Sequence, residues 1–362
     1  MIDRWDPSRG GAEAALAELA EGLEARGHAV LAFAAEGPAK GRPAQERWRR
    51  VRPAWSLGRS RGEKLLARAL DEAAREAGCD VRIGLRHLFE TDLWWPHGGC
   101  HRATLRALGK PLRGRHRVFV ELEARMARSA RRVACVSRLV LEEVLAEYPE
   151  LRGRAVLVGS ALDLERFHPR ERATSGAALR ASLGIGADEP LIGFSARQPR
   201  TKGLSVLLES FRALRAAGSG ATLLVAGSAV RAEEHVRVLR EVDPVAFAAA
   251  CDLVCLPTLR DTFGRVVAEA LACGTPVVTT ARAGAAELLA RPEQGRVLGD
   301  PRDTAALTEA LAEGLALRPG RELVREAALA CGRETWLDRM EALCRECAAG
   351  SNSDSPRSRS IA

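Results

Sequence analysis

Short apolar runs alternate with amphipathic helical segments along almost the whole chain, and the alternation starts twice. In the first half, helical periodicity over residues 12–26 is followed by an apolar run at 28–33. In the second half, an apolar run at 191–194 is followed by helical periodicity over 203–216. Alternating strands and helices predict parallel sheets with helices on both faces. We therefore expect an α/β protein made of two Rossmann-like, doubly wound domains that face a cleft.

The 362 residues suit two domains, each able to bury its own core. The stretch from Phe167 to Gly186 has lost apolar periodicity, which favours an inter-domain linker. The expected divisions are an N-terminal domain at 1–168, a second domain at 187–318, a C-terminal helical segment at 319–349 and a disordered tail at 350–362.

The beginning of the chain departs from this pattern. It reaches Gly10 and Gly11 without an apolar run ahead of them, whereas a Rossmann-like unit opens with a strand. Either the N-terminal domain lacks its first strand, or the recorded start lies too far downstream.

The formal charge of +8 is concentrated in the first half of the chain. Residues 1–180 hold 33 Lys and Arg against 24 Asp and Glu, a net +9, and residues 102–138 hold eleven basic residues against Glu121 and Glu123. Such a surface suits a nucleic acid, an anionic membrane or a phosphorylated acceptor, and the plain alternative is a solvated Arg-rich helix.

The nine cysteines are scattered singly, without the paired spacing of a zinc site. An odd number of cysteines with no signal peptide favours reduced thiols and a cytoplasmic location. No apolar run reaches the roughly 18 residues that a membrane span requires.

The strongest motif runs from Pro257 to Val278 and reads as loop, helix and strand. Asp261 lies just before the helix that Gly264 opens, where backbone N–H groups favour an anion. Glu269 lies one to two turns along the same helix. Backbone amides that face a phosphate, with carboxylates that accept hydrogen bonds from sugar hydroxyls, suit the binding of a nucleoside diphosphate sugar. The plain alternative is an ordinary βαβ unit in which the Asp caps the helix and the Glu is exposed to solvent.

A second motif contributes two cations. Arg197 and Lys202 follow the apolar run at 191–194, and Gly203 opens the next helix. Cations there can stabilise a diphosphate as it becomes a leaving group. Taken alone this signal is weak, and a basic surface turn is the plain alternative.

The two motifs, in this order, resemble those of the retaining glycosyltransferases of family 4 with the GT-B fold, which include glucosyltransferases of lipopolysaccharide core assembly. The acidic pair with seven residues between corresponds to Asp261 and Glu269, although the family's first position is most often Glu. The resemblance implies that Asp261 contacts the transferred sugar and that Glu269 holds the ribose hydroxyls. The donor domain is then 187–318. The backbone that approaches the sugar and phosphate belongs to Phe263, Gly264, Arg265 and Val266.

Two elements of the N-terminal domain fit the same family. Gly10 and Gly11 precede an amphipathic helix and resemble the family's glycine loop, which is not a dinucleotide fingerprint. His97, in a Gly- and His-rich loop after an apolar run, is our candidate for a contact with the transferred sugar, and His101 is the second choice. Either histidine can equally be structural.

The resemblance implies transfer of a sugar from a nucleoside diphosphate sugar with retention of configuration, and no bound metal or cofactor, since Arg197 and Lys202 supply the positive charge. We expect front-face attack, with Asp261 orienting the sugar and domain closure excluding water. The preferred acceptor is a saccharide or lipid-linked saccharide of the cell envelope, such as lipopolysaccharide core. The enzyme would contact the inner face of the cytoplasmic membrane through its basic surface.

Two alternatives remain open. The absent first strand and the short connection between Gly227 and Asp243 favour a degenerate, non-catalytic protein that binds a sugar nucleotide or glycan. Positive charge alone favours a nucleic-acid binder, but an aromatic content of 4% leaves few stacking platforms, so no nucleic-acid partner is expected.

Overall fold

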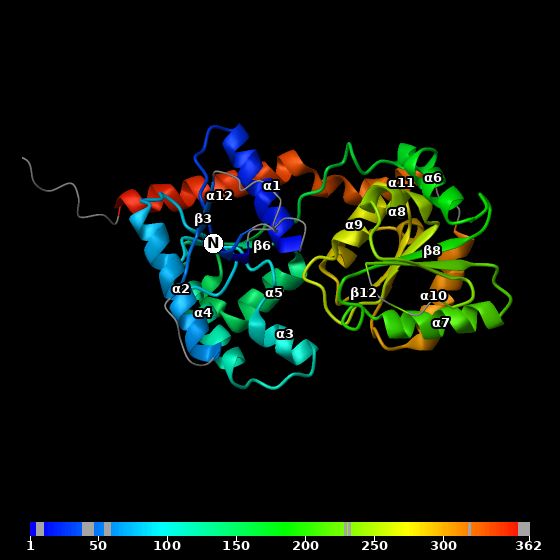
Figure 1. Cartoon of the computed structure of the whole chain (residues 1–362), viewed down its shortest axis with the longest axis horizontal. Helices are drawn as coiled ribbons and strands as arrows, with labels where there is room; N and C mark the ends of the chain where they lie inside the picture. Colours follow the sequence, from blue (N-terminus) through cyan, green and yellow to red (C-terminus); the bar gives the residue numbers. More distant parts are fainter. Residues whose placement is uncertain are drawn as a thin grey trace, which may run out of the picture. The chain divides into compact units, whose positions relative to one another are not determined.

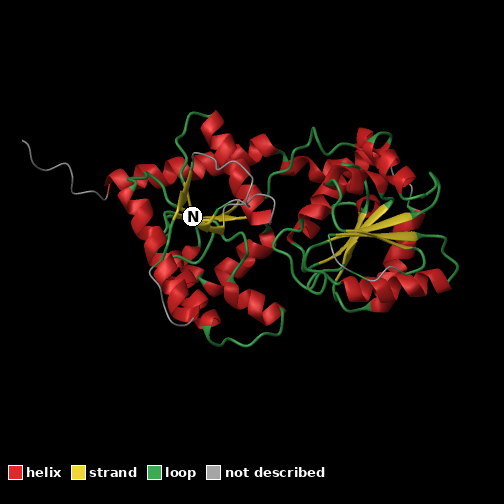
Figure 2. Ribbon diagram, in the orientation of Figure 1, coloured by secondary structure: helices red, strands yellow, loops and turns green. Residues whose placement is uncertain are grey.

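The computed structural model describes residues 1–4, 11–37, 47–53, 59–227, 230, 233–317 and 320–353. It forms two compact units, Met1–Gly159 with Glu334–Ala362, and Ser160–Arg333, called here the first and the second unit. Each unit consists of parallel strands with helices packed around them (Figure 2).

The strands of the first unit form two parallel groups that Met1 connects. The order β1-β2-β3 makes one sheet and β4-β5-β6-β7 the other. Leu85 N donates to Met1 O at 3.1 Å, and Met1 N donates to Ile83 O at 2.6 Å. These bonds place β4 beside β1. The strands are β1 (Ile2–Arg4), β2 (Ala32–Glu36), β3 (Trp48–Arg50), β4 (Ile83–Gly84), β5 (Leu93–Trp94), β6 (Arg132–Cys135) and β7 (Ala155–Leu157).

The expectation that the first strand is missing is wrong. Ile2–Arg4 forms β1, which pairs in parallel with β2, and Met1 and Ile2 are buried. A strand of three residues is too short to show period-two alternation, and its place depends on hydrogen bonds to residues more than 80 positions away.

Helices lie on both sides of the first unit's strands, with α1 and α12 on one side and α4 and α5 on the other (Figure 1). Ser137 caps α5, because its Oγ accepts from Val140 N at 3.2 Å. The helices are α1 (Gly11–Ala25), α2 (Arg59–Glu76), α3 (His101–Ala107), α4 (Arg115–Ser129), α5 (Arg138–Glu147), the short 3₁₀ turn η1 (Pro149–Leu151) and α12 (Arg333–Ser353).

The second unit holds one six-stranded parallel sheet in the order β10-β9-β8-β11-β12-β13. Its central strands are buried on both faces, as continuous apolar runs predict for a parallel sheet. The strands are β8 (Leu191–Ser195), β9 (Thr222–Ala226), β10 (Val236–Leu239), β11 (Leu253–Leu256), β12 (Val277–Thr280) and β13 (Gly295–Leu298).

In the second unit, α7 and α10 lie on one face of the sheet, and α8 and α9 on the other (Figure 1). The helices are α6 (Ser175–Ser182), α7 (Leu204–Ala216), α8 (Pro244–Ala250), α9 (Arg265–Ala272), α10 (Thr304–Ala316) and α11 (Arg321–Arg325). The 3₁₀ turns are η2 (Pro169–Arg172), η3 (Gly284–Leu288), η4 (Pro292–Gln294) and η5 (Glu326–Cys331).

The segment expected to be a linker, Phe167 to Gly186, is instead part of the second unit. It carries η2 and α6, and the buried Arg180 of α6 donates to Ala250 O at 2.9 Å and to Asp252 Oδ2 at 3.2 Å. Hydrogen-bonded arginine rather than apolar side chains anchors this helix, which is why its apolar periodicity is weak.

The C-terminal segment also differs from the expectation. Residues up to Arg333 belong to the second unit, and α12 packs with the first, where Glu341 pairs with Arg26 and His28, each at 2.8 Å. Hydrogen bonds from His28, Arg26 and Arg345 together lower the pKa of Glu341 to about 2. The helix α12 runs to Ser353, so the tail expected from residue 350 does not begin there. Among the helices described, none is both long and apolar enough to cross a bilayer.

Candidate functional site

The candidate donor site lies at the carboxyl edge of the second unit's sheet. The parallel strands β8, β11 and β12 are neighbours, so the loops that follow them meet at the same edge. The loop after β11 carries Asp261, whose N–H donates to Arg282 O at 2.8 Å, while Asp261 O accepts from Gly284 N at 3.0 Å. The loop after β12 thus fixes the backbone of Asp261.

Lys202 and Asp261 form an ion pair across two of these loops, with Nζ to Oδ2 at 2.5 Å. Their side chains are 21% and 18% exposed, so the pair is partly shielded from water. Asp261 Oδ1 also accepts from Phe263 N at 3.3 Å, and Lys202 Nζ lies 3.4 Å from Arg260 O. The structure therefore joins residues from the two predicted motifs into one cluster.

Two glycines hold this cluster in place. Gly203 and Gly264 have φ of 81° and 91° and stand at the N-caps of α7 and α9. Left-handed backbone of this kind is strained for any residue with a Cβ. At Gly203 a Cβ would also overlap the carbonyl oxygen of Pro257, so the first loop can approach the second only because this residue is glycine.

Glu269 lies on α9 and its side chain is 14% exposed. Burial raises the pKa of Glu269, and the ion pair with Arg265, at 3.4 Å from Nε to Oε1, acts in the opposite direction. The first turn of α9 begins at Arg265 and continues with the half-buried Val266. The helix thus presents backbone N–H groups at its start and a shielded carboxylate one turn later.

Arg197 and Phe263 complete the predicted donor residues. Arg197 is exposed on the loop between β8 and α7 that also carries Lys202. Phe263 is buried, and its carbonyl accepts from Ala285 N at 2.6 Å. The structure thus places Arg197 on the same loop as Lys202, and Phe263 supports the turn before α9.

In the first unit the structure brings two of the predicted residues together. Gly11 opens α1, and a Cβ built on it would lie 4.0 Å from His97 Cε1. The His97 ring packs edge-on against buried Trp95, with ring centroids 5.5 Å apart. Gly10 lies outside the described residues.

His101 belongs to a different cluster. Its Nε2 lies 2.9 Å from His116 Nδ1, and its ring packs against Phe119. Its backbone N donates to Glu123, which is 2% exposed. Burial, followed by the nearby His87, lowers the pKa of His101 to about 4. The contacts of His101 join α3 to α4.

Sequence reasoning missed the segment Arg282 to Ala285, whose backbone holds both Asp261 and Phe263. The available signal in the sequence was Gly284, which closely follows the buried strand β12 at the carboxyl edge of the sheet. No cluster of three or more His, Cys, Asp or Glu suited to a metal ion is found among the described residues.

Comparisons with known proteins match both halves of the chain. Residues 9–166 match the family model described as Glycosyltransferase Family 4, and residues 189–316 match the model described as Glycosyl transferases group 1. The chain belongs to glycosyltransferase family 4.

Solved structures resemble this family 4 chain over almost its whole length. WaaG, a glycosyltransferase involved in lipopolysaccharide biosynthesis, superposes with a TM-score of 0.75 at 19% identity and covers 96% of this chain and 97% of its own. HepE from Anabaena in complex with UDP-glucose has a TM-score of 0.57 at 18% identity, covering 98% and 100%. The fold is GT-B, as the sequence predicted.

Curated relatives share more sequence over a shorter stretch. D-inositol 3-phosphate glycosyltransferase of Saccharomonospora viridis is 33% identical over 186 residues, which are 45% of this chain and 42% of the relative. The protein of the same name from Corynebacterium urealyticum is 33% identical over 189 residues, or 46% and 44%. The family 4 chain thus spans less than half the length of either relative.

Proposed function

We propose that this chain is a glycosyltransferase that moves a sugar from a nucleoside diphosphate sugar to a saccharide or lipid-linked saccharide with retention of configuration. The observation that carries the proposal is the cluster of Lys202, Asp261 and Glu269 around the first turn of α9. Family membership and the UDP-glucose complex of the GT-B protein HepE support it.

Each group of the cluster suits one part of the donor. The amides at the start of α9 and the ammonium of Lys202 would bind the diphosphate, with exposed Arg197 as a second cation. Lys202 has three N–H donors, so it can hold Asp261 and still donate to a phosphate oxygen. Glu269 would accept hydrogen bonds from the ribose, and Asp261 from the transferred sugar.

The contacts of the two carboxylates support an orienting role for Asp261. Its Oδ2 pairs with Lys202 and its Oδ1 accepts from Phe263 N, while Glu269 pairs with Arg265. A nucleophile would need a carboxylate oxygen directed at the anomeric carbon. We therefore propose front-face substitution. The bond from the anomeric carbon to the phosphate oxygen breaks as the bond to the acceptor oxygen forms on the same face, and the acceptor proton passes to the departing diphosphate.

Positive charge from Arg197 and Lys202 would stabilise the departing diphosphate, so we propose that the reaction requires no metal ion or other cofactor. Turnover should then be the same with excess EDTA as with added Mg²⁺. Loss of turnover on chelation, restored by Mg²⁺, would contradict this part of the proposal.

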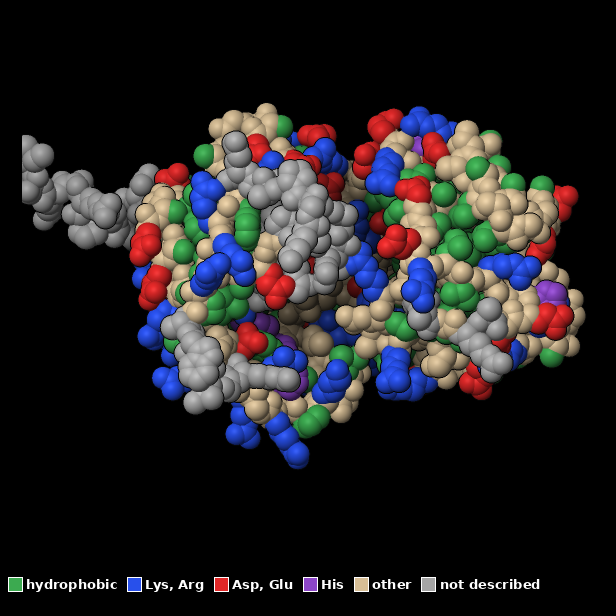
Figure 3. All heavy atoms as spheres, in the orientation of Figure 1, with side chains coloured by type: hydrophobic (Ala, Val, Ile, Leu, Met, Phe, Trp, Pro, Cys, Tyr) green, Lys and Arg blue, Asp and Glu red, His purple; other side chains and the backbone are tan. Residues whose placement is uncertain are grey.

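For the acceptor we propose a phosphorylated or lipid-linked saccharide of the cell envelope, handled at the inner face of the cytoplasmic membrane. In the described residues, Lys110, Arg113, Arg115 and Arg117 have no acidic partner, and Figure 3 shows basic side chains around the α3–α4 segment. The curated relatives are named for a phosphorylated acceptor, which suits the same charge. A second basic and aromatic stretch, from Arg47 to Trp55, suits an anionic membrane surface as well, but its end, Trp55, lies outside the described residues.

Vesicles test the membrane contact. The full chain should sediment with vesicles of phosphatidylglycerol and phosphatidylcholine at low salt, and stay in solution with phosphatidylcholine alone. The double variant Lys110→Gln, Arg113→Gln should bind less. Equal behaviour with both vesicle types would remove the support for a membrane contact.

A transfer assay tests the activity. UDP-, GDP- and ADP-sugars are incubated with inositol phosphate or lipopolysaccharide core acceptors, released nucleoside diphosphate is measured, and the product's anomeric configuration is read by NMR. We expect one donor to react with retention. If a donor binds but no nucleoside diphosphate is released with any acceptor, the alternative of a non-catalytic protein that binds a sugar nucleotide would be favoured instead.

A further inference from the structure

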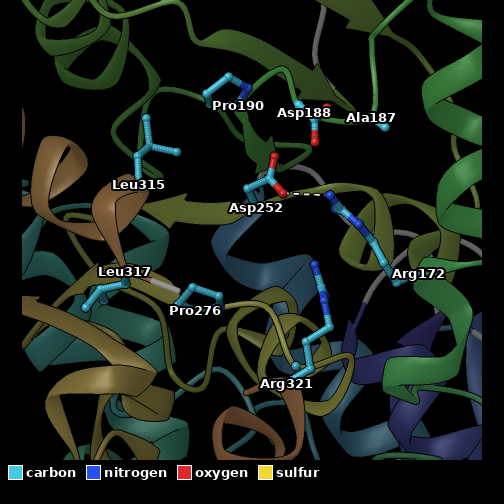
Figure 4. A pocket seen from close by; sticks show the side chains of 10 residues that line it. Arg172, Ala187, Asp188, Pro190, Asp252, Pro276, Leu315, Leu317 and Arg321 are labelled. Atoms are coloured by element: carbon cyan, nitrogen blue, oxygen red, sulfur yellow. Dashed lines mark hydrogen bonds and ion pairs between the residues drawn. The ribbon is translucent and has the colours of Figure 1, made fainter. Parts of the chain in front are cut away.

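A cavity of about 430 Å³ opens at the amino edge of the second unit's sheet (Figure 4). Pro190 precedes β8, Asp252 precedes β11 and Pro276 precedes β12, and all three line it. The candidate donor site lies at the opposite edge, about 15 Å away for strands of this length. The cavity is therefore separate from the proposed donor site.

Positive charge exceeds negative charge on one wall. Asp252 pairs through Oδ1 with Arg172 at 2.7 Å and through Oδ2 with Arg180 at 3.2 Å. The single negative charge of Asp252 is thus shared between two positively charged guanidinium groups. Arg172 Nη1 also donates to the carbonyls of Ala249, Ala250 and Cys251, so its position is fixed.

A third guanidinium adds to this excess. Arg321 Nη1 donates to Cys273 O and to Thr275 Oγ1, both at 3.2 Å and both neutral, and Arg321 has no acidic partner within the described residues. Burial, followed by repulsion from Arg172, lowers the pKa of Arg321, while Asp252, which forms no ion pair with it, acts in the opposite direction. Figure 4 shows its guanidinium directed toward Asp252 and Arg172.

The backbone of Arg321 is held close to the end of α9. A Cβ on Gly274 would lie 2.5 Å from Arg321 Cβ and 2.6 Å from Arg321 O. The position of the guanidinium is therefore set by close backbone packing as well as by its own hydrogen bonds.

The remaining walls are mostly apolar. Leu315 and Leu317 face the cavity from the end of α10, and Pro190 and Pro276 flank it (Figure 4). Asp188 is exposed at the rim and has no basic partner in the described residues. A ligand with a single anionic group and an apolar body matches this lining, whereas Asp188 disfavours a ligand with anionic groups at both ends.

We propose that this cavity binds a small organic anion, whose single oxyanion group contacts Arg321 and Arg172 and whose apolar body packs against Leu315, Leu317 and the two prolines. A partly buried guanidinium without a carboxylate is costly, and a ligand oxyanion supplies the absent partner with charge-assisted hydrogen bonds. A carboxylate and a phosphate monoester share this chemistry.

Titration calorimetry on the full chain tests the proposal with four probes. Benzoate and phenyl phosphate carry the oxyanion and an apolar body, benzyl alcohol lacks the charge, and inorganic phosphate lacks the body. We expect saturable one-to-one binding of benzoate or phenyl phosphate, whichever oxyanion fits, and at least tenfold weaker binding of the other two. Excess UDP should not displace the bound probe.

Three variants locate the binding. Arg321→Gln should weaken it at least tenfold, and Asp188→Asn, at an exposed residue, should tighten it about two- to fivefold by removing repulsion. Arg212→Gln removes an exposed arginine paired with Glu233 elsewhere in the same unit and should change nothing. The melting temperature of each variant checks its fold.

The proposal is overturned if neither benzoate nor phenyl phosphate binds saturably, if inorganic phosphate binds as tightly as they do, or if Asp188→Asn and a folded Arg321→Gln leave the affinity unchanged. Direct binding is measured, so the result does not depend on glycosyl transfer.

Discussion

Replacing Glu269 by Gln should weaken donor binding while it leaves the free energy of unfolding almost unchanged. Burial raises the pKa of Glu269, so the ionised carboxylate is less favourable in the folded chain than in the unfolded one. Its contribution to the free energy of unfolding therefore becomes less favourable as the pH rises through its pKa. Glutamine removes this cost at neutral pH, together with the ion pair to Arg265, which is worth about 0.3–0.5 kcal/mol.

The effect on donor binding should be larger and unfavourable. Two hydrogen bonds from ribose hydroxyls to a carboxylate are worth roughly 3 kcal/mol, and a glutamine oxygen can keep one neutral bond of about 1 kcal/mol. The loss of about 2 kcal/mol corresponds to a roughly thirtyfold higher Kd. The free energy of unfolding should stay within about 0.5 kcal/mol of the parent value.

Titration calorimetry with the preferred nucleoside diphosphate sugar and urea unfolding at pH 7 give the two quantities. Glu313→Gln is the matched control, because it removes the exposed ion pair to Arg296 in the same unit. The parent chain should also lose affinity as the pH falls through a pKa above the usual carboxyl range, and Glu269→Gln should not. Unchanged donor affinity in Glu269→Gln would refute the ribose role.

Three further changes test other parts of the site and fold. Lys202→Met should lower kcat roughly 10²- to 10³-fold, which is the usual effect of removing one group that stabilises developing charge. The measurement is the steady-state release of nucleoside diphosphate, and an unchanged kcat would show that Lys202 does not stabilise the leaving group. Gly203→Ala should lower the melting temperature by several degrees, because its Cβ would overlap the Pro257 carbonyl, and an unchanged melting temperature would contradict the close approach. The folded state lowers the pKa of His101 to about 4, so stability should be lost as the pH falls from about 6.5 toward 4. His101→Gln should flatten this loss in urea titrations, and an equal loss in both proteins would show that other groups cause it.

The sheet of the second unit was predictable because its strands are continuous apolar runs. The strands at residues 222–226 and 253–256 are wholly buried, so their sequences show the run directly. The edge strand Gly295–Leu298 was missed, since it opens with glycine and arginine and is half exposed.

The short strands of the first unit were not predictable in the same way. The first strand has three residues and the fourth has two, and hydrogen bonds of Met1 join them. Periodicity cannot be read from so few positions, and pairing between distant residues leaves no local signal.

The candidate site also has one part that the sequence indicates and one part that it does not. The residues around Asp261 and Glu269 could be grouped as a candidate site because one contiguous segment carries them. The contact between Lys202 and Asp261 joins residues 59 positions apart and depends on the first strand of this sheet pairing with the fourth. Sequence order alone does not contain that pairing.

The most direct test of the donor site is the melting temperature of the full chain with UDP-, GDP- and ADP-sugars, compared with Glu269→Ala. At a hundredfold excess over Kd, a bound donor stabilises the fold by about 2.7 kcal/mol, or about 5–10 °C in a unit of this size. We predict such a rise with one nucleotide class and a much smaller rise in the variant. No shift with any donor in folded protein, or an equal shift in Glu269→Ala, would contradict the account.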